Sequence, residues 1–197
     1  MISELLSSYK IILASKSPRR QFLLKGLDID FTVITKDVEE IYPKHLMREE
    51  IPMHLCRLKA DAFNNEMDDN TIVVTADTIV WFDEHELNKP KDREDAIRML
   101  FELSGNMHEV YTGVCVKSKF KAIDFFVLSK VFFKKLSQEE IVYYVDNYKP
   151  YDKAGAYGAQ EWIGYVAIER IEGSYFNVMG LPTKRLYEEL VKFIKTK

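Results

Sequence analysis

The chain has 197 residues, within the size range of one folded domain, and such a domain buries about 70% of the surface that its unfolded chain exposes. With 47% hydrophobic and 30% charged residues, and only eight glycines and six prolines, the composition excludes a fibrous or disordered chain. The net charge of -3 argues against a protein that binds duplex DNA without sequence preference, because such proteins concentrate lysine and arginine. We therefore expect one compact domain over residues 1–197, with any phosphate-binding site confined to a local cluster.

The two cysteines, Cys56 and Cys115, lie in apolar stretches without a histidine or cysteine at metal-ligand spacing. We expect neither a disulfide nor a zinc site, and a reduced compartment fits such cysteines. The first ten residues include Glu4 and lack a long apolar run, and no later window reaches the ~18 apolar residues of a membrane span. The expected location is the cytoplasm, with no membrane insertion.

In the first half of the chain, predicted strands and helices alternate. Short runs rich in β-branched residues predict strands at 11–14, 31–34, 71–76 and 79–82. The polar pair Asp77-Thr78 is expected to interrupt the last two. A helix is expected to start at Pro18 with Phe22, Leu23, Leu24 and Leu27 on its apolar face. Apolar residues at spacings of three and four predict a longer helix over 48–66.

In the second half, strands cluster. Residues 83–86 resemble a hairpin turn, Asp92 is a candidate cap for a helix that ends near Gly105, and two extended runs follow over 109–116 and 123–133. Ser137 and Glu140 match a capping box, and a last helix is expected to start near Pro182. A glycine-rich aromatic stretch lies over 154–181. These patterns predict an α/β fold in which helices pack on a mixed sheet.

The segment 13–20 reads LASKSPRR and places two hydroxyls, a lysine and two arginines where a helix begins. Free backbone N–H groups at a helix start attract anions, and guanidinium groups can hold phosphate oxygens in a bidentate way. The segment is a candidate polyphosphate cradle. A solvated basic first turn is the alternative, although basic charge at a helix start opposes the helix dipole and so favours an anionic partner.

Asp77 lies within the most apolar predicted strand, where a carboxylate must be hydrogen-bonded, paired or metal-bound. Glu40 is a candidate second oxygen ligand, because two carboxylates together with substrate phosphates commonly hold Mg²⁺. The alternative for Asp77 is a structural residue in a turn at a strand end. Lys59 and Lys89, which alone would be expected to face solvent, could neutralise phosphate charge in combination with these acids.

Several further residues have structural explanations. His108 is expected to be a hydrogen-bonded structural histidine, so we leave it out of the site. The tyrosines at 143, 144, 148, 151 and 157 lack an accompanying basic stripe, which favours core or dimer contacts over base stacking. No nucleophile elbow and no Walker-type lysine loop occur in the sequence, which excludes covalent hydrolase and P-loop readings.

Six motifs occur in the order found in the Maf family, and together they cover residues 10 to 190. They are LASKSPRR at 13–20, ADT at 76–78, KP at 89–90, SGNMHEVYTG at 104–113, KAGAYG at 153–158, and EGS at 172–174 with GLP at 180–182. The chain therefore resembles Maf proteins, which are nucleoside triphosphate pyrophosphatases. The resemblance implies the α/β architecture of the inosine triphosphate pyrophosphatases, with an elongated mixed sheet, two lobes, a central cleft and often a homodimeric assembly.

The resemblance also implies roles for single residues. Asp77 would be the catalytic acid/base, and Glu40 and Asp77 would hold a divalent cation, Mg²⁺ or Mn²⁺. Lys59 and Lys89 would offset charge on the transferring group. Phosphate and substrate contacts would come from Ser15, Arg19, Arg20, Thr78 and Gln160. Two positions depart from the family pattern: the acidic motif reads Val38-Glu39-Glu40 where Asp-Glu is commoner, and Glu161 follows Gln160 where glycine is frequent.

The implied activity is hydrolysis of dTTP and UTP to the monophosphate and pyrophosphate, typical of the pyrimidine branch of the family. Gln160 is the warrant for the base, since an amide offers a donor and an acceptor to the edge of uracil or thymine. A nucleotide-sensing or nucleic-acid-binding module without catalysis is the main alternative, and release of the γ-phosphate is a third. We expect a nucleoside triphosphate as partner and no stable nucleic acid complex.

Overall fold

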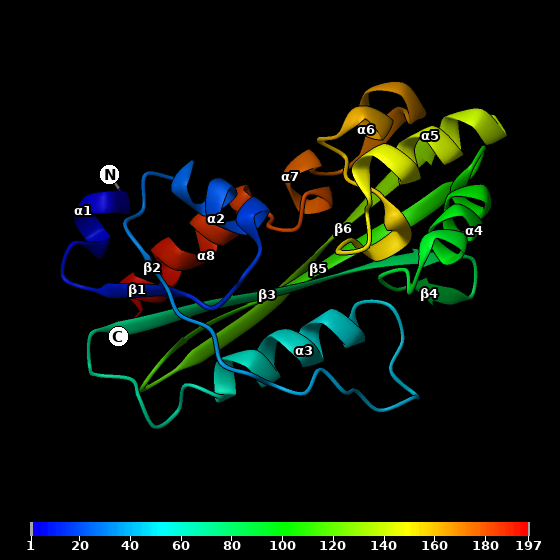
Figure 1. Ribbon diagram of the computed structural model, residues 1–197. Coiled ribbons are helices and arrows are strands. Elements are labelled where there is room, and N and C mark those ends of the chain that lie inside the picture. The colour runs from blue at the N-terminus through cyan, green and yellow to red at the C-terminus, as the bar shows by residue number, and fades with distance from the viewer. Residues whose placement is uncertain (1, 197) are drawn as a thin grey trace. The chain divides into compact units, whose positions relative to one another are not determined.

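The computed structural model describes residues 2–196, which form helices and a mixed seven-stranded sheet (Figure 1). The strands are β1 (Lys10–Leu13), β2 (Thr32–Val33), β3 (Thr71–Phe82), β4 (His85–Leu87), β5 (Met107–Ser118), β6 (Ala122–Phe133) and β7 (Ile168–Glu172). The helices are α1 (Ile2–Leu6), α2 (Pro18–Lys25), α3 (Glu50–Asp61), α4 (Arg93–Leu103), α5 (Gln138–Tyr148), α6 (Trp162–Ala167), α7 (Tyr175–Val178) and α8 (Thr183–Lys195), with a 3₁₀ turn, η1, at Ala154–Ala156.

The strand order is β2-β1-β3-β5-β6-β7, and β4 pairs with β3 outside this path. Strand β1 is parallel to β2 and β3, with Ile12 opposite both Thr32 and Val73. Strands β4 and β7 run antiparallel to β3 and β6. The sheet is therefore mixed and flanked by helices, as the alternation of elements in the first half and the clustering of strands in the second predict.

The chain divides into two compact units. One comprises residues 2–77, 112–127 and 180–196 of the described chain, and the other comprises 78–111 and 128–179. The division falls within β3, β5 and β6, so each of these long strands contributes residues to both units. The chain passes from one unit to the other at four places, and the first of them is the step from Asp77 to Thr78.

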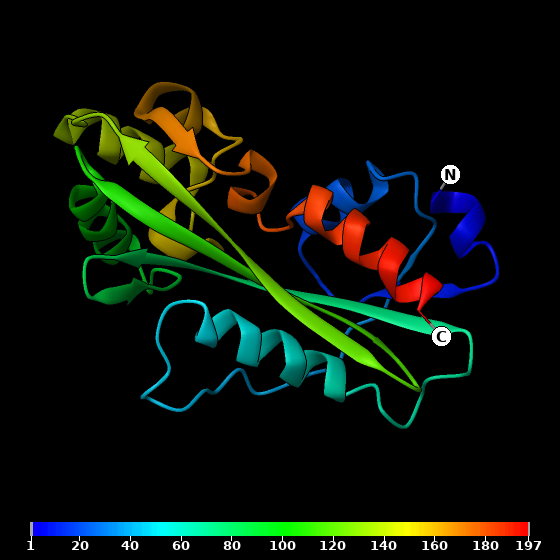
Figure 2. The same cartoon turned by 180° about the vertical axis from the view of Figure 1, so that it is seen from behind.

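Within the first unit, α3 lies on one face of the strands, and α2 and α8 lie on the other (Figures 1 and 2). The approach of α3 depends on small residues. Cys56 and Ala60 on the helix form a buried cluster with Cys115 on β5. A Cβ on Gly113 of β5 would lie 2.5 Å from the backbone carbonyl of Pro52, so only glycine fits there. Both cysteines are buried free thiols, which confirms the expected absence of a disulfide.

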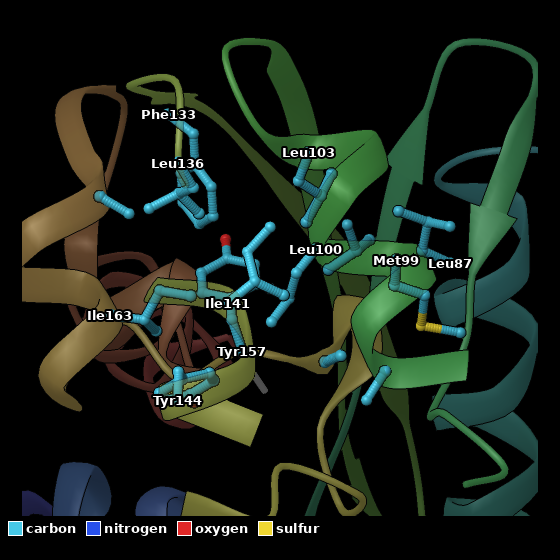
Figure 3. Packing of buried hydrophobic residues seen from close by; sticks show 14 of the residues in the cluster. Leu87, Met99, Leu100, Leu103, Phe133, Leu136, Ile141, Tyr144, Tyr157 and Ile163 are labelled. Atoms are coloured by element: carbon cyan, nitrogen blue, oxygen red, sulfur yellow. The ribbon is translucent and has the colours of Figure 1, made fainter. Parts of the chain in front are cut away.

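The second unit has its own apolar core, in which α4 and α5 pack against the strands (Figure 3). Its large side chains include Leu87, Met99, Leu100, Leu103, Phe133, Leu136, Ile141, Tyr144, Tyr157 and Ile163. The predicted caps are confirmed: Asp92 accepts a hydrogen bond from the backbone of Asp95, and Ser137 and Glu140 form a reciprocal capping box at the start of α5. These caps satisfy backbone donors that a helix start leaves open.

Several local predictions are wrong. Asp77 and Thr78 do not interrupt β3, which runs unbroken over Thr71–Phe82, because the Asp77 carboxylate has a cationic partner. Helix α3 is shorter than 48–66, since Arg48 adopts a left-handed backbone (φ 48°) and residues after Asp61 turn away from the helix. On the predicted apolar face of α2, Leu23 and Leu24 are buried as expected, but Phe22 is 70% exposed.

Two regions contain elements that the sequence patterns do not predict. Residues 2–6 form α1, and the aromatic stretch 154–181 contains η1, α6, β7 and α7. These elements are only three to six residues long, shorter than the window that hydrophobic periodicity needs. Gly155 and Gly173 also interrupt the hydrophobic pattern of this stretch, and their positive φ angles are typical of turns.

Candidate functional site

The position of Asp77 relative to α3 follows from one buried hydrogen bond. Thr75, two residues earlier on β3 and therefore on the same face, donates its hydroxyl to the backbone carbonyl of Cys56 at 2.6 Å. Cys56 belongs to α3, and Lys59 follows it by three residues, about one helical turn. This attachment brings the Lys59 side chain to the Asp77 carboxylate.

Lys59 lies between two carboxylates. Its ammonium nitrogen is 2.6 Å from Asp77 Oδ1 and 3.1 Å from Glu40 Oε1. The side chains of Lys59 and Asp77 are only 14% and 12% exposed, whereas that of Glu40 is 50% exposed. An ammonium so placed offsets the cost of burying a carboxylate within an apolar strand.

The segment between β1 and α2 holds the candidate phosphate residues. Ser15 is buried, and its hydroxyl oxygen accepts from the backbone N–H of Ser17 at 3.2 Å and from Arg20 Nη1 at 3.5 Å. Ser17 caps α2 by accepting from the backbone of Arg20. Arg20 Nε donates to the carbonyl of Gly180 at 2.8 Å, which ties the helix start to the GLP motif. These bonds orient hydroxyl and guanidinium groups at a helix N-terminus.

The charges around Arg20 connect this segment to the acidic residues. Burial lowers the pKa of the Arg20 guanidinium, the attraction of Asp77 opposes that effect, Arg19 lowers the pKa further and Glu40 raises it. Arg20 and the half-buried Arg19 therefore lie within electrostatic range of each other, and Arg20 within range of both acids. The first unit thus brings together Ser15, Arg19, Arg20, Glu40, Lys59 and Asp77, which are the residues predicted to handle phosphate and metal.

The remaining predicted residues belong to the second unit. Thr78 follows Asp77 directly and is half-buried, and Lys89 is exposed after β4. Gln160 is half-buried, and its amide oxygen is buried without a hydrogen-bond partner among residues 2–196. A buried acceptor without a partner costs free energy, which a donor on a ligand would recover.

Glu40 and Asp77 are the acidic side chains of the candidate site that could hold a divalent cation. Among residues 2–196, no group of three or more His, Cys, Asp or Glu side chains converges as a metal site. Glu40 and Asp77 do converge on one cationic centre, the Lys59 ammonium. Two carboxylates suffice for Mg²⁺ or Mn²⁺ when substrate phosphates supply further oxygens, so the residues fit a cation that binds together with the nucleotide.

His108 has the structural role expected of it. It is 1% exposed, its Nε2 lies 2.8 Å from the hydroxyl oxygen of Tyr157, and burial lowers its pKa to about 3. Tyr144 and Tyr157 are core residues, whereas Tyr143, Tyr148 and Tyr151 are 38–48% exposed. A neutral buried imidazole of this kind is a packing residue.

Sequence reasoning missed one buried charge cluster in the second unit. Lys153, the lysine of the KAGAYG motif, is 8% exposed and lies 3.0 Å from the carboxylate of Glu161. The only sequence signal was the presence of Glu161 directly after Gln160, and nothing in the spacing indicates that these charges pair. The cluster surrounds the loop that carries Gln160.

The sequence was compared with known proteins. A family model described as Maf-like protein matches residues 10–193. A dTTP/UTP pyrophosphatase of Flavobacterium johnsoniae is 54% identical over 194 residues, 98% of this chain and all of that protein. A dTTP/UTP pyrophosphatase of Parabacteroides distasonis is 53% identical over 191 residues, 96% of this chain and 99% of that protein.

Among solved structures, a nucleoside-triphosphatase, dITP/XTP pyrophosphatase, from Mycobacterium abscessus covers 94% of this chain and 96% of its own, at 11% identity and a TM-score of 0.45. No helix within residues 2–196 is both long and apolar enough to cross a membrane. The family match over nearly the whole chain, together with the ordered motifs and the residues they bring together, shows that this chain belongs to the Maf family.

Proposed function

We propose that this protein hydrolyses dTTP and UTP to the nucleoside monophosphate and pyrophosphate. The observation that carries the proposal is the identity of 53–54% over almost the full length with proteins named dTTP/UTP pyrophosphatase. The site supports the proposal, because the buried Lys59 ammonium pairs with the carboxylates of Asp77 and Glu40. Ser15, Arg19 and Arg20 lie at the start of α2 and could bind phosphate.

In the proposed reaction, a water oxygen bonds to the α-phosphorus while the bond from that phosphorus to the α,β-bridging oxygen breaks. Asp77 accepts the proton that the water loses, and pyrophosphate leaves with the bridging oxygen. Lys59 and Lys89 offset negative charge on the transferring group and the leaving pyrophosphate. Arg19 and Arg20 hold phosphate oxygens through their planar N–H groups, and Ser15 adds a hydroxyl.

A divalent cation, Mg²⁺ or Mn²⁺, would be held by Glu40 and Asp77 and would supply Lewis-acid neutralisation of phosphate charge. Lys59 already compensates both carboxylates, so the fold does not depend on that cation. Thr78 and Gln160 are proposed to recognise the base. A cytoplasmic location and the lack of a stable nucleic acid partner remain predictions from composition and charge, and a homodimeric assembly remains a prediction from the family resemblance.

The test is a product assay on the purified full-length protein with Mg²⁺. Pyrophosphate and orthophosphate are measured separately for UTP, dTTP and 7-methylguanosine triphosphate. We expect pyrophosphate as the product and a higher kcat/KM for the two pyrimidine nucleotides, because a site built on base-edge hydrogen bonds discriminates strongly. Orthophosphate release would show attack at the γ-phosphate, and binding without either product would identify a nucleotide-sensing module.

Gln160→Glu is the matched specificity variant. It keeps the size of the side chain but replaces the amide donor with a carboxylate, so the ratio of UTP to 7-methylguanosine triphosphate turnover should fall. An unchanged ratio would remove Gln160 from base recognition and leave the pyrophosphatase proposal intact.

A further inference from the structure

Gln160 is a central residue of a β-turn in the second unit. The backbone N–H of Glu161 donates to the carbonyl of Gly158 at 2.9 Å, which closes a four-residue turn over 158–161. The amide oxygen of Gln160 is buried, and no donor within residues 2–196 binds it. The position of this amide therefore depends on where the backbone of the turn lies.

The side chain of Tyr144, on α5, is hydrogen-bonded to both ends of this turn. Its hydroxyl oxygen accepts from the backbone N–H of Gly158 at 3.0 Å, and its hydroxyl hydrogen is donated to Glu161 Oε2. Burial raises the pKa of the Tyr144 hydroxyl, and the hydrogen bond to Glu161 raises it further, so the hydroxyl keeps the hydrogen that it donates. One side chain thus completes a ring of hydrogen bonds that includes the turn.

Tyr144 is itself fixed by the core of the second unit. Its side chain is fully buried, and Figure 3 shows it among the large apolar residues of that core. Its ring stacks on that of Tyr148, with the centroids 5.1 Å apart. Because side chains in a close-packed core have little freedom to move, the Tyr144 hydroxyl is a rigid attachment point for the turn.

Two further contacts hold the same turn. The buried Lys153 lies 3.0 Å from Glu161 Oε1, so each carboxylate oxygen of Glu161 has a partner. The carbonyl of Ala159 accepts from the hydroxyl of Tyr175 at 3.3 Å. Glu161 stands where the family pattern frequently has glycine, and a glycine has no side chain to accept from Tyr144. The attachment of this end of the turn is therefore a feature of this chain.

We propose that Tyr144 is a positioning residue for base recognition, whose hydroxyl fixes the turn over 158–161 and thereby places the Gln160 amide at the edge of uracil or thymine. This inference rests on the proposed function, in which Gln160 recognises the base. It gives Tyr144 no contact with the substrate and no chemical step.

The test is a double-mutant cycle on the full-length protein, with kcat and KM for UTP as the readout. Tyr144→Phe keeps the ring and removes the hydroxyl. It should raise KM about fivefold at unchanged kcat, the size expected when one hydrogen bond to the base is lost. In the Gln160→Ala background, the same substitution should raise KM by less than about twofold, because both residues act through one amide. A substitution that merely loosened the fold would have the same effect in both backgrounds.

Tyr157→Phe is the matched control. It removes the hydroxyl of a second buried tyrosine of the same core, which lies 2.8 Å from His108 Nε2 on β5, and KM for UTP should stay as in the parent. If Tyr144→Phe does not fold, Glu161→Ala decides. It removes the acceptor of the Tyr144 hydroxyl, while Lys153 keeps Asp152 as a partner at 2.7 Å, and it should raise KM in the same way.

The results that overturn the inference are distinct from failure of the proposed function. If the parent releases pyrophosphate from UTP but Tyr144→Phe leaves KM unchanged, or raises it equally with and without Gln160, Tyr144 does not position that amide. An equal rise of KM in Tyr157→Phe would likewise show that any loss of a buried hydroxyl has this effect. A parent that releases no pyrophosphate from UTP overturns the proposed function and this inference with it.

Discussion

At the scale of residues, the lysine between Asp77 and Glu40 explains how an apolar strand carries a negative charge. Asp77 is 8% exposed in β3, and its partner Lys59 comes from α3 at 2.6 Å. A buried carboxylate without a partner would cost several kcal/mol or become neutral. With Lys59 in place, the buried carboxylate has a cationic partner at hydrogen-bond distance.

Asp77→Asn should therefore abolish turnover without unfolding the protein. The change is nearly isosteric but removes the base, and loss of a positioned acid/base lowers rates by about 100-fold or more. Pyrophosphate release and thermal melting are measured on the same preparation. Asp61→Asn is the control, because Asp61 ends α3 and pairs with Lys117 at the surface. Near-parent turnover in a folded Asp77→Asn variant would exclude Asp77 as the base.

His108 gives a second prediction at this scale, on stability against pH. Its pKa is lowered from 6.5 to about 3 in the folded protein, so between these values the unfolded chain binds a proton that the folded chain does not. Stability from this group is complete above pH 6.5 and is lost as the pH falls, by about 1.4 kcal/mol per pH unit.

Urea unfolding of the parent and of His108→Gln at pH 7 and pH 5 tests this prediction. The parent should lose about 2 kcal/mol more than the variant between the two pH values. His85→Gln, which changes an exposed histidine, should behave as the parent does. Equal losses in parent and His108→Gln would show that His108 is not buried in its neutral form.

At the scale of elements, the placement of α3 on the sheet determines the site. Gly113 of β5 lets the backbone of α3 approach at Pro52, and Thr75 binds the carbonyl of Cys56 further along the same helix. Lys59 belongs to this helix, so its contact with Asp77 depends on where α3 packs on the sheet. Gly113, the last residue of the SGNMHEVYTG motif, is therefore a packing residue on which the position of Lys59 depends.

Gly113→Ala should destabilise the protein and lower its activity together. The added methyl group would meet backbone atoms of Pro52 at 2.5 Å, which cannot move aside as a side chain can, and overpacking of this kind costs about 1–3 kcal/mol. Turnover per folded molecule should fall as well, because the displaced α3 carries Lys59. Unfolding free energy and kcat are measured in parallel.

Gly26→Ala provides the matched control. A Cβ there meets its nearest atoms only at 3.4 Å, and the residue already has a helical backbone, so stability should change by less than about 1 kcal/mol. If Gly113→Ala is as stable and active as Gly26→Ala, the close approach of α3 does not position Lys59.

At the scale of the whole molecule, the charge distribution indicates that the stability of the fold does not require the divalent cation proposed for the reaction. The net charge is only -3, and the candidate site balances its own acids with Lys59 and Arg20. The nucleotide-free protein therefore has no unpaired site charge that demands a cation. In the proposed function, a triphosphate would add the negative charge that makes binding of a divalent cation favourable.

Removal of divalent metal should consequently stop turnover without lowering stability. In the presence of a chelator, pyrophosphate release from UTP should cease, and excess Mg²⁺ or Mn²⁺ should restore it. The melting temperature of the nucleotide-free protein should be the same with and without chelator, since a ligand stabilises only what it binds. Full activity in chelator would exclude the metal, and a lower melting temperature would indicate a structural ion.

The sequence by itself determined the class of fold and the identity of most candidate residues. Some features can be predicted from short stretches of sequence, because the residues that specify them lie within a few positions of one another. They are the β3 strand, the caps at Asp92 and Ser137, and the basic start of α2. The ordered motifs added the residue types expected of a nucleotide site. Very short elements such as α1 and η1 were not predicted, because they are too short to show a hydrophobic periodicity.

Only the tertiary structure decided which of these residues meet. Lys59 and Asp77 are 18 positions apart, Arg20 and Gly180 are 160 apart, and Tyr144 reaches Glu161 across 17. Such pairs depend on strand order and on where a helix can approach a sheet, which hydrophobic periodicity does not encode. The continuity of β3 through Asp77 follows from one of these distant pairs, because the carboxylate is tolerated within the strand only where Lys59 neutralises it.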